Sequence, residues 1–250
     1  MPRPEVKTIT FSIDGREVQA PENMMLVDAA KHGDVEIPVF CYEPKLGAPV
    51  GACRMCLVEI EGIPKLQTGC STPVKDGMVV HTQTTRVHEA QQAVVEFLLI
   101  NHPLDCPVCD KGGECPLQDI SFGWGGGRSR YIEPKRHFQK PLELSPLIAI
   151  DRERCILCYR CVRYSQEVAE DYQLVLQERG AASYVATFDA SVRRPVQRQH
   201  HRAVPGGRAH LAPLPLPRPP VGHRGLGLDL HDVPRPVQRH LHRPRRPRPA

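Results

Sequence analysis

Residues near the N-terminus alternate between apolar and polar side chains, the pattern of a strand with one buried face. Residues 7–13, Lys-Thr-Ile-Thr-Phe-Ser-Ile, follow this period of two. Asp14-Gly15 is a strong hairpin-turn signal, and residues 17–20 can pair back on the first run. Residues 24–31 then change to helical spacing, which stops at Gly33 and predicts a glycine C-cap. The sequence therefore predicts a hairpin followed by a short helix.

Two further strand-like runs complete this unit, at residues 55–60 and 78–81. The resulting order is strand, strand, helix, cysteine-rich loop and more strands, which is the order of a β-grasp ferredoxin. We therefore predict that residues 1–83 form a β-grasp, ferredoxin-like domain of the α+β class.

A helix is predicted to follow this domain. Six apolar residues between Thr85 and Asn101 fall on one helical face and indicate packing: Val87, Ala90, Val94, Val95, Leu98 and Leu99. The glycine-rich residues 123–127 have no strand before them and no helix with Lys-Ser/Thr after them, so they predict a flexible connector rather than a phosphate-binding loop. Residues 147–150 predict a short strand, and residues 159–171 predict a helix.

The formal net charge of +5 averages two segments of opposite character. Residues 1–188 hold 20 Lys and Arg against 25 Asp and Glu, whereas residues 189–250 hold 13 Arg, no Lys and 3 acidic residues. The negative charge balance of residues 1–188 argues against nucleic acid as the main partner of this protein. The sequence has no run of 18 apolar residues and no signal-peptide pattern, so we expect a cytoplasmic protein. In that reducing compartment, ten cysteines favour metal binding over disulfides.

The ten cysteines form three groups, and the first lies in the predicted β-grasp domain. Cys41, Cys53, Cys56 and Cys70 are separated by 11, 2 and 13 residues. Four thiolates after a β-grasp helix suit a [2Fe–2S] cluster, with two sulfurs on each iron. The first gap differs from the plant-type spacing of 4 residues. A four-cysteine zinc site is the alternative.

The second group combines a histidine with three cysteines: His102, Cys106, Cys109 and Cys115. The same set is common in zinc sites, so taken alone zinc and iron are comparable here. The other two groups have iron–sulfur character and favour a [4Fe–4S] cluster. Because a neutral imidazole replaces a negative thiolate, His102 would raise the reduction potential of that cluster.

The third group, Cys155, Cys158 and Cys161, has the C-x2-C-x2-C spacing of a [4Fe–4S] ferredoxin. Zinc sites rarely use three cysteines at this repeat. A complete site needs a fourth cysteine, and none follows Cys161 in the sequence. We therefore expect this second [4Fe–4S] cluster to be lost or incomplete.

Residues 101–119, Asn-His-Pro-Leu-Asp-Cys-Pro-Val-Cys-Asp-Lys-Gly-Gly-Glu-Cys-Pro-Leu-Gln-Asp, closely resemble the large G-type iron–sulfur subunit of bacterial NADH:quinone oxidoreductase, respiratory complex I. Residues 51–59 and 154–163 resemble the same family, and the resemblance runs from about residue 8 to about residue 189. It implies a [2Fe–2S] cluster on Cys41, Cys53, Cys56 and Cys70, and a [4Fe–4S] cluster on His102, Cys106, Cys109 and Cys115. It also implies that Cys155, Cys158 and Cys161 are three of the four ligands of a second [4Fe–4S] cluster.

The resemblance further implies a function in electron transport. The chain would be a subunit of an oxidoreductase and translocase, relaying electrons from NADH, through a flavin on a partner subunit, toward quinone. It would contain no catalytic residue of its own. Its partners would be the flavin- and NADH-binding subunit and other peripheral-arm subunits, and it would reach the inner face of the cell membrane only through the complex.

Together these features predict four regions: the [2Fe–2S] domain at 1–83, the His/Cys3 [4Fe–4S] domain at 84–130, a partial [4Fe–4S] ferredoxin-like domain at 131–188 and an Arg/Pro-rich tail at 189–250. We expect the large molybdopterin-oxidoreductase-like domain of the family to be absent from this chain. The tail resembles nothing in the family, and its twelve prolines predict disorder.

We expect the tail to be the product of a reading-frame shift. Residues 199–210 can be encoded by DNA that, in another frame, gives Gly-Asn-Ile-Ile-Glu-Leu-Cys-Pro-Val-Gly-Ala-Leu-Thr. That peptide resembles the family segment with the fourth cysteine, and its cysteine codon would straddle Val204 and Pro205. The alternative is a genuine basic, disordered tail.

Two other functions are compatible with the cysteine pattern. One is a diaphorase-type iron–sulfur subunit of an NAD-reducing hydrogenase or a formate dehydrogenase. The other is a zinc-stabilised module whose arginine-rich tail contacts nucleic acid, since arginine runs bind phosphate.

Overall fold

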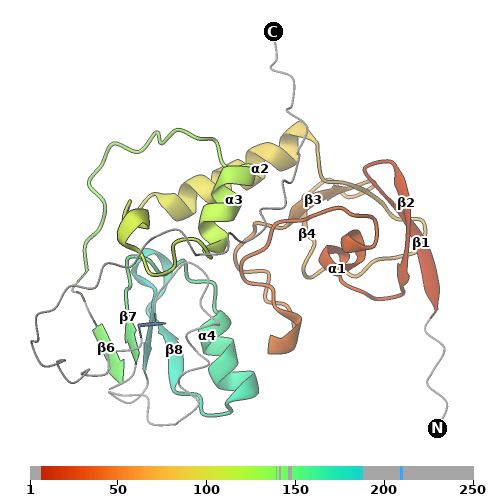
Figure 1. The fold of residues 1–250 in the computed structure, drawn as a ribbon. Coiled ribbons are helices and arrows are strands. Elements are labelled where there is room, and N and C mark those ends of the chain that lie inside the picture. Colours follow the sequence, from red (N-terminus) through yellow and green to blue (C-terminus); the bar gives the residue numbers. More distant parts are fainter. Residues whose placement is uncertain (1–6, 139, 141, 146–147, 188–208, 211–250) are drawn as a thin grey trace, which may run out of the picture. The chain divides into compact units, whose positions relative to one another are not determined.

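The computed structural model describes residues 7–138, 140, 142–145, 148–187 and 209–210. They all belong to one compact unit, Met1–Leu214. The described residues form three sheets. Figure 1 shows the helices and strands, with colours that follow the sequence from the N-terminus to the C-terminus.

The first sheet has five strands in the order β2-β1-β5-β3-β4. β1 (Thr8–Ile13) pairs antiparallel with β2 (Arg16–Pro21) and parallel with β5 (Val79–His81). β3 (Leu57–Ile60) pairs antiparallel with both β5 and β4 (Gln67–Thr68). A parallel pair at the centre of a mixed sheet, with helix α1 (Leu26–Lys31) packed on it, is the predicted β-grasp fold.

The alternation read from the sequence places every second side chain of β1 in the core. Ile9, Phe11 and Ile13 are buried and pack against Leu26 and Ala29 of α1. The turn between β1 and β2 has positive φ at Asp14 and Gly15, as a two-residue hairpin turn requires.

Gly33 serves close packing rather than the predicted cap. Helix α1 ends at Lys31, His32 is its C-cap, and the left-handed residue is Asp34. A Cβ atom added to Gly33 would lie 2.5 Å from Cγ2 of the buried Val18. Glycine is needed here because the chain passes directly over β2.

We therefore expect Gly33→Ala to destabilise the protein by about 1–3 kcal/mol, because Val18 or the helix must move. Urea unfolding measures the change. The matched control is Gly123→Ala in helix α3 (Pro116–Trp124), where an added Cβ meets no described atom within 4 Å. An equal loss of stability in both variants would contradict this explanation.

Helix α2 (Thr85–Leu99) confirms the predicted helix, and Thr84 caps it by accepting a hydrogen bond from the Val87 amide at 3.3 Å. Within the predicted apolar stripe, Val87 and Val95 are buried and the other members are partly buried. Gln91 lies on the same face and is also buried, donating to the Leu57 carbonyl at 3.2 Å.

Helix α3 was not predicted, and it includes Gly123 and Trp124. The prediction of a flexible connector is therefore wrong at these two residues. Leu117 and Ile120 pack inward, and Pro116 occupies the first turn, where proline is favourable. Gly125 follows as the C-cap.

The third region is built from two small sheets and a helix. β6 (Leu142–Ser145) and β7 (Ile148–Ile150) pair antiparallel, and β8 (Leu174–Gln177) pairs antiparallel with β9 (Tyr184–Thr187). Helix α4 (Arg160–Arg163) continues as a π-helical turn over Tyr164–Val168, so the predicted helix at 159–171 is shorter than expected. Single 3-10 turns occur at Pro44–Leu46, Cys106–Val108 and Gly180–Ala182.

The predicted tail, residues 189–250, lies outside the described residues except for Ala209–His210. These two residues form β10, which pairs antiparallel with β7. Within the described residues, no helix has the length and apolar character needed to cross a membrane.

Candidate iron–sulfur sites

The structure brings the four cysteines of the first group together: Cys41, Cys53 and Cys56 lie between helix α1 and strand β3, and Cys70 follows strand β4. The thiols of Cys53 and Cys70 hydrogen-bond with Cys41, and that of Cys56 with Cys70. Three of the four are buried, and Cys53 is partly buried. The hydrogen bond with Cys41, followed by burial, raises the pKa of Cys53 well above its ordinary value. The free Cys53 thiol is therefore held neutral, and metal binding must displace its proton.

Backbone amides point at these sulfurs. The amides of Cys41 and Met55 hydrogen-bond to the sulfur of Cys53, and the amide of Cys70 to that of Cys56. Arg54 has φ 59°, and this left-handed turn between Cys53 and Cys56 brings the Met55 amide back toward the sulfur. Amides directed at thiolates are the hydrogen bonds that tune iron–sulfur potentials.

The second group lines one pocket. Its walls include all four predicted ligands, His102, Cys106, Cys109 and Cys115, together with the side chain of Arg154. A 3-10 turn presents the first two cysteines, and Cys115 is the N-cap of α3. A Cβ on Gly112 would lie 3.0 Å from the Cys109 carbonyl oxygen, so glycine is what allows this loop to close.

Burial, followed by the nearby positive charges of Lys135 and Arg154, lowers the pKa of His102. The imidazole is therefore biased toward its neutral form, which is the form that binds a metal. A neutral His102 imidazole is able to bind iron, and its role as a ligand stays a prediction.

The third group forms a tight loop before helix α4. Leu157 and Tyr159 have φ of 52° and 64°, so the backbone is left-handed at two positions between Cys155 and Cys161. The amides of Leu157, Arg160 and Val162 hydrogen-bond to the sulfurs of Cys155, Cys158 and Cys161, respectively. Burial raises the pKa of the Cys158 thiol to about 12. The loop thus has the same amide cradle as the first group.

All ten cysteines are free thiols. The described residues contain no group of three or more His, Cys, Asp or Glu side chains arranged to hold one metal ion. Ligands of an iron–sulfur cluster bind different iron atoms, so they need not converge on a single point. The donor types and the amide cradles fit clusters.

The three groups share one neighbourhood. A single apolar core contains Phe40, Cys41, Met55, Val95, Leu117, Ile120, Ile156 and Cys158. A cavity of about 1030 Å³ is lined by one predicted ligand from each group, Cys53, His102 and Cys155. The fold therefore brings together three groups that are far apart in the sequence.

Two arginines of the third region donate to backbone carbonyls of the first region, and the sequence did not reveal these contacts. Arg163 is 5% exposed, and its guanidinium donates to the carbonyls of Cys41 at 3.3 Å, Gly47 at 3.2 Å and Ala48 at 2.7 Å, and also to that of Leu46. Arg160 donates to the Tyr42 carbonyl at 2.6 Å. The only sequence signal was their position beside Cys161.

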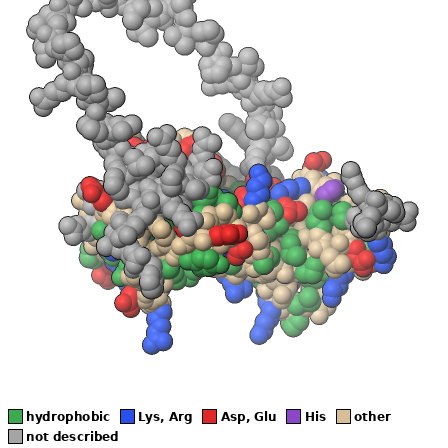
Figure 2. Space-filling view, turned by 90° about the horizontal axis from the view of Figure 1, so that it is seen from below, with side chains coloured by type: hydrophobic (Ala, Val, Ile, Leu, Met, Phe, Trp, Pro, Cys, Tyr) green, Lys and Arg blue, Asp and Glu red, His purple; other side chains and the backbone are tan. Residues whose placement is uncertain are grey.

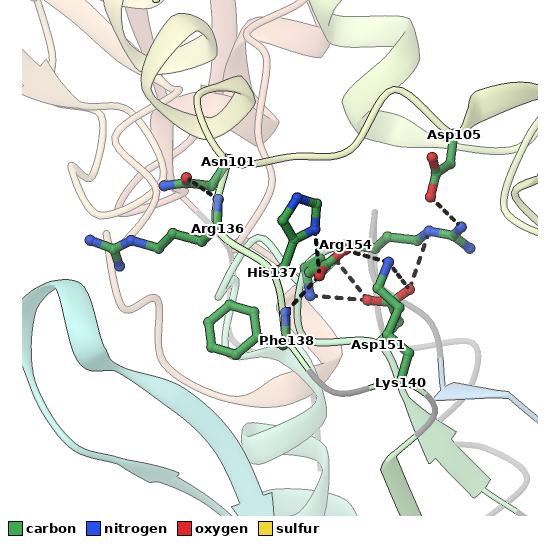
Figure 3. A network of polar contacts seen from close by, with 9 residues as sticks. Asn101, Asp105, Arg136, His137, Phe138, Lys140, Asp151 and Arg154 are labelled. Atoms are coloured by element: carbon green, nitrogen blue, oxygen red, sulfur yellow. Dashed lines mark hydrogen bonds and ion pairs between the residues drawn. The ribbon is translucent and has the colours of Figure 1, made fainter. Parts of the chain in front are cut away.

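A second polar network connects the third region with the second cysteine group (Figure 3). Arg154 donates to Asp105, immediately before Cys106, at 2.8 Å. Its Nε lies 3.3 Å from Asp151, whose carboxylate also lies 3.3 Å from Lys140. Lys140 pairs in turn with Glu153.

Figure 2 shows Lys and Arg side chains interspersed with Asp and Glu over the part of this face drawn in colour. Among these coloured residues, no continuous basic surface of the kind that binds nucleic acid is visible.

Three family models match successive parts of the chain. A "2Fe-2S iron-sulfur cluster binding domain" matches residues 6–85. The "NADH-ubiquinone oxidoreductase-G iron-sulfur binding region" matches residues 91–130. The "NADH-quinone oxidoreductase subunit 3, ferredoxin-like domain" matches residues 145–196.

Curated relatives agree with these models. The G-type subunit of NADH-quinone oxidoreductase from Streptomyces coelicolor is 48% identical over 186 residues, which are 74% of this chain and 22% of that protein. Its Mycobacterium tuberculosis counterpart is 50% identical over 188 residues, 74% of this chain and 23% of the relative. The mitochondrial NADH dehydrogenase [ubiquinone] iron-sulfur protein 1 of Solanum tuberosum is 43% identical over 188 residues, which are 75% of this chain and 25% of that protein. The chain thus spans about a quarter of the length of these relatives.

Among solved structures, a chain of an NAD+-reducing [NiFe]-hydrogenase in the H2-reduced state superposes with a TM-score of 0.70 and 27% identity. The match covers 84% of this chain and 90% of the hydrogenase chain.

Proposed function

Because this chain carries the N-terminal iron–sulfur region of the G-type subunit of NADH-quinone oxidoreductase, we propose that it relays electrons between clusters in such a complex. Electrons would come from NADH through a flavin on a partner subunit and leave toward quinone. The chain would assemble with peripheral-arm subunits and lie at the inner face of the membrane through them.

The observation that carries this proposal is the set of amide-to-sulfur hydrogen bonds in two of the three groups, around Cys53, Cys56, Cys155, Cys158 and Cys161. Amides placed at cysteine sulfurs stabilise the negative charge of a bound cluster. When bound, the clusters supply one-electron chemistry. The chain itself positions them and excludes water with the shared apolar core.

We assign Cys41, Cys53, Cys56 and Cys70 to a [2Fe–2S] cluster, and His102, Cys106, Cys109 and Cys115 to a [4Fe–4S] cluster. Cys155, Cys158 and Cys161 would hold an incomplete second [4Fe–4S] cluster. Anaerobic reconstitution of the full chain with iron and sulfide, followed by visible absorption and low-temperature EPR spectroscopy, tests these assignments. A colourless protein that takes up zinc but no iron would refute them, since zinc thiolates do not absorb in the visible range.

A diaphorase-type subunit of an NAD-reducing hydrogenase is the second candidate, and the superposition with a hydrogenase chain favours it. The higher identity with the G-type subunits, 48–50% against 27%, favours complex I. The identity of the flanking genes discriminates the two.

We expect His102→Cys to keep the second cluster but to lower its reduction potential. The substitution exchanges a neutral imidazole for a negative thiolate, which stabilises the oxidised form. EPR-monitored redox titration of the full chain measures the potential, and His88→Cys in helix α2 is the control for adding a thiol. If His102→Cys changed neither the potential nor the spectrum, His102 would not be a ligand.

A further inference from the structure

We propose that Arg154 sets the reduction potential of the second cluster, acting on a site whose predicted ligands all lie elsewhere in the chain. This inference rests on the proposed function, because it takes the His102 group to hold a [4Fe–4S] cluster. It adds a residue of the third region that acts on the reduction potential of a cluster bound by the second region.

The first observation is the location of the guanidinium. Arg154 lines the pocket formed by His102, Cys106, Cys109 and Cys115, although it follows the last of these by 39 positions. Its side chain is only 10% exposed. A cation so little exposed to water is weakly screened, so it acts strongly on a charge that changes inside the pocket.

The second observation is how the guanidinium is held. It donates to Asp105 at 2.8 Å on one side, and its Nε lies 3.3 Å from Asp151 on the other (Figure 3). Asp151 also accepts hydrogen bonds from the amides of Glu153 at 3.0 Å and Arg154 at 3.4 Å. The arginine is therefore fixed in place by its own loop.

The third observation is an unfilled hydrogen-bonding capacity. The Nε of Arg154 is buried and makes no hydrogen bond among the described residues, because its approach to Asp151 lacks hydrogen-bond geometry. Buried polar atoms are normally satisfied. A negatively charged cluster in the adjoining pocket would offer this Nε–H an acceptor.

The sign of the effect follows from charge. Reduction adds one electron to the cluster, and a nearby positive charge favours the reduced form. Loss of Arg154 removes this positive charge and leaves the carboxylates of Asp105 and Asp151 beside the pocket, so the potential falls.

The test is an EPR-monitored redox titration of the reconstituted full chain. Arg154→Gln should shift the midpoint potential of the second cluster to a more negative value. We expect the equilibrium constant for reduction to fall about tenfold, which corresponds to about 59 mV for one electron. Arg154→Lys should recover most of the shift because it restores the charge. A role confined to packing would lower stability in both variants without moving the potential.

Asp105→Asn keeps the arginine but removes one of its counter-charges, so it should shift the potential in the opposite direction. If the Arg154→Gln variant does not bind the cluster, the Asp105→Asn variant tests the inference in its place. Arg130→Gln is the matched control, because the Arg130 guanidinium also donates to a carboxylate, that of Glu96 at 2.7 Å, but lines neither the second pocket nor the cavity shared with His102.

An unchanged midpoint in Asp105→Asn, or in a loaded Arg154→Gln variant, would overturn the inference. A wild-type chain that binds no iron at the His102 group would instead refute the proposed function. The two failures are thus distinguished by the wild-type spectrum.

Discussion

Anaerobic reconstitution of this chain is expected to yield two complete clusters and no stable third one. Cys155, Cys158 and Cys161 supply only three thiolates, and a [4Fe–4S] cube needs a ligand at each of its four irons. The third site should therefore be empty, labile or a three-iron species. Iron analysis should give about six iron atoms in complete clusters, rather than about ten for three complete clusters.

A chimera makes this prediction sharper. Replacing residues 199–210 by the alternate-frame peptide Gly-Asn-Ile-Ile-Glu-Leu-Cys-Pro-Val-Gly-Ala-Leu-Thr should restore a third [4Fe–4S] EPR signal, because it returns one cysteine near Val204 and Pro205. The same peptide with its cysteine changed to serine is the control. A stable third signal from the unaltered chain would contradict the prediction, and genomic codons that do not contain this frame would contradict the frame-shift explanation.

Arg163→Ala is expected to lower the free energy of unfolding by about 3–5 kcal/mol, since a charged donor is lost from a buried site. The guanidinium donates to carbonyls of the loop that runs from Cys41 to Ala48. Without it, those acceptors are left buried and unsatisfied. The Cys41 loop should also loosen, so the [2Fe–2S] cluster should be lost more readily.

Urea unfolding and the lifetime of the [2Fe–2S] absorption measure these two effects. Arg163→Lys should recover part of the stability, because an ammonium has three donors but lacks the planar fork of arginine. The exposed Arg128→Ala is the control and should stay within about 0.5 kcal/mol of wild type. A loss of the same size in the control would show that the Arg163 contacts are not the cause.

Local patterns predicted the elements that depend on neighbours in sequence. The period of two in β1, the Asp14-Gly15 turn and the apolar stripe of α2 are all present in the structure. Helix α3, strand β4 and the β8–β9 hairpin were missed. Strand β4 has only two residues and is defined by its pairing with β3, so no periodicity could reveal it.

The second and third cysteine groups were visible in the sequence because their ligands lie close together along the chain. The spacing C-x2-C-x2-C and the His102 to Cys115 segment indicate their chemistry without a fold. The ligand assignments themselves are still predictions that the proposed spectroscopy tests.

Periodicity was sufficient to predict the β-grasp domain, and the resemblance of the cysteine motifs was sufficient to predict the family. The charges that surround each cysteine group depend instead on tertiary packing. Arg154 reaches Asp105 across 49 positions, and Arg163 reaches Cys41 across 122. Such contacts carry no sequence period, because they arise when separately folded segments pack and a buried guanidinium must find acceptors wherever the chain presents them.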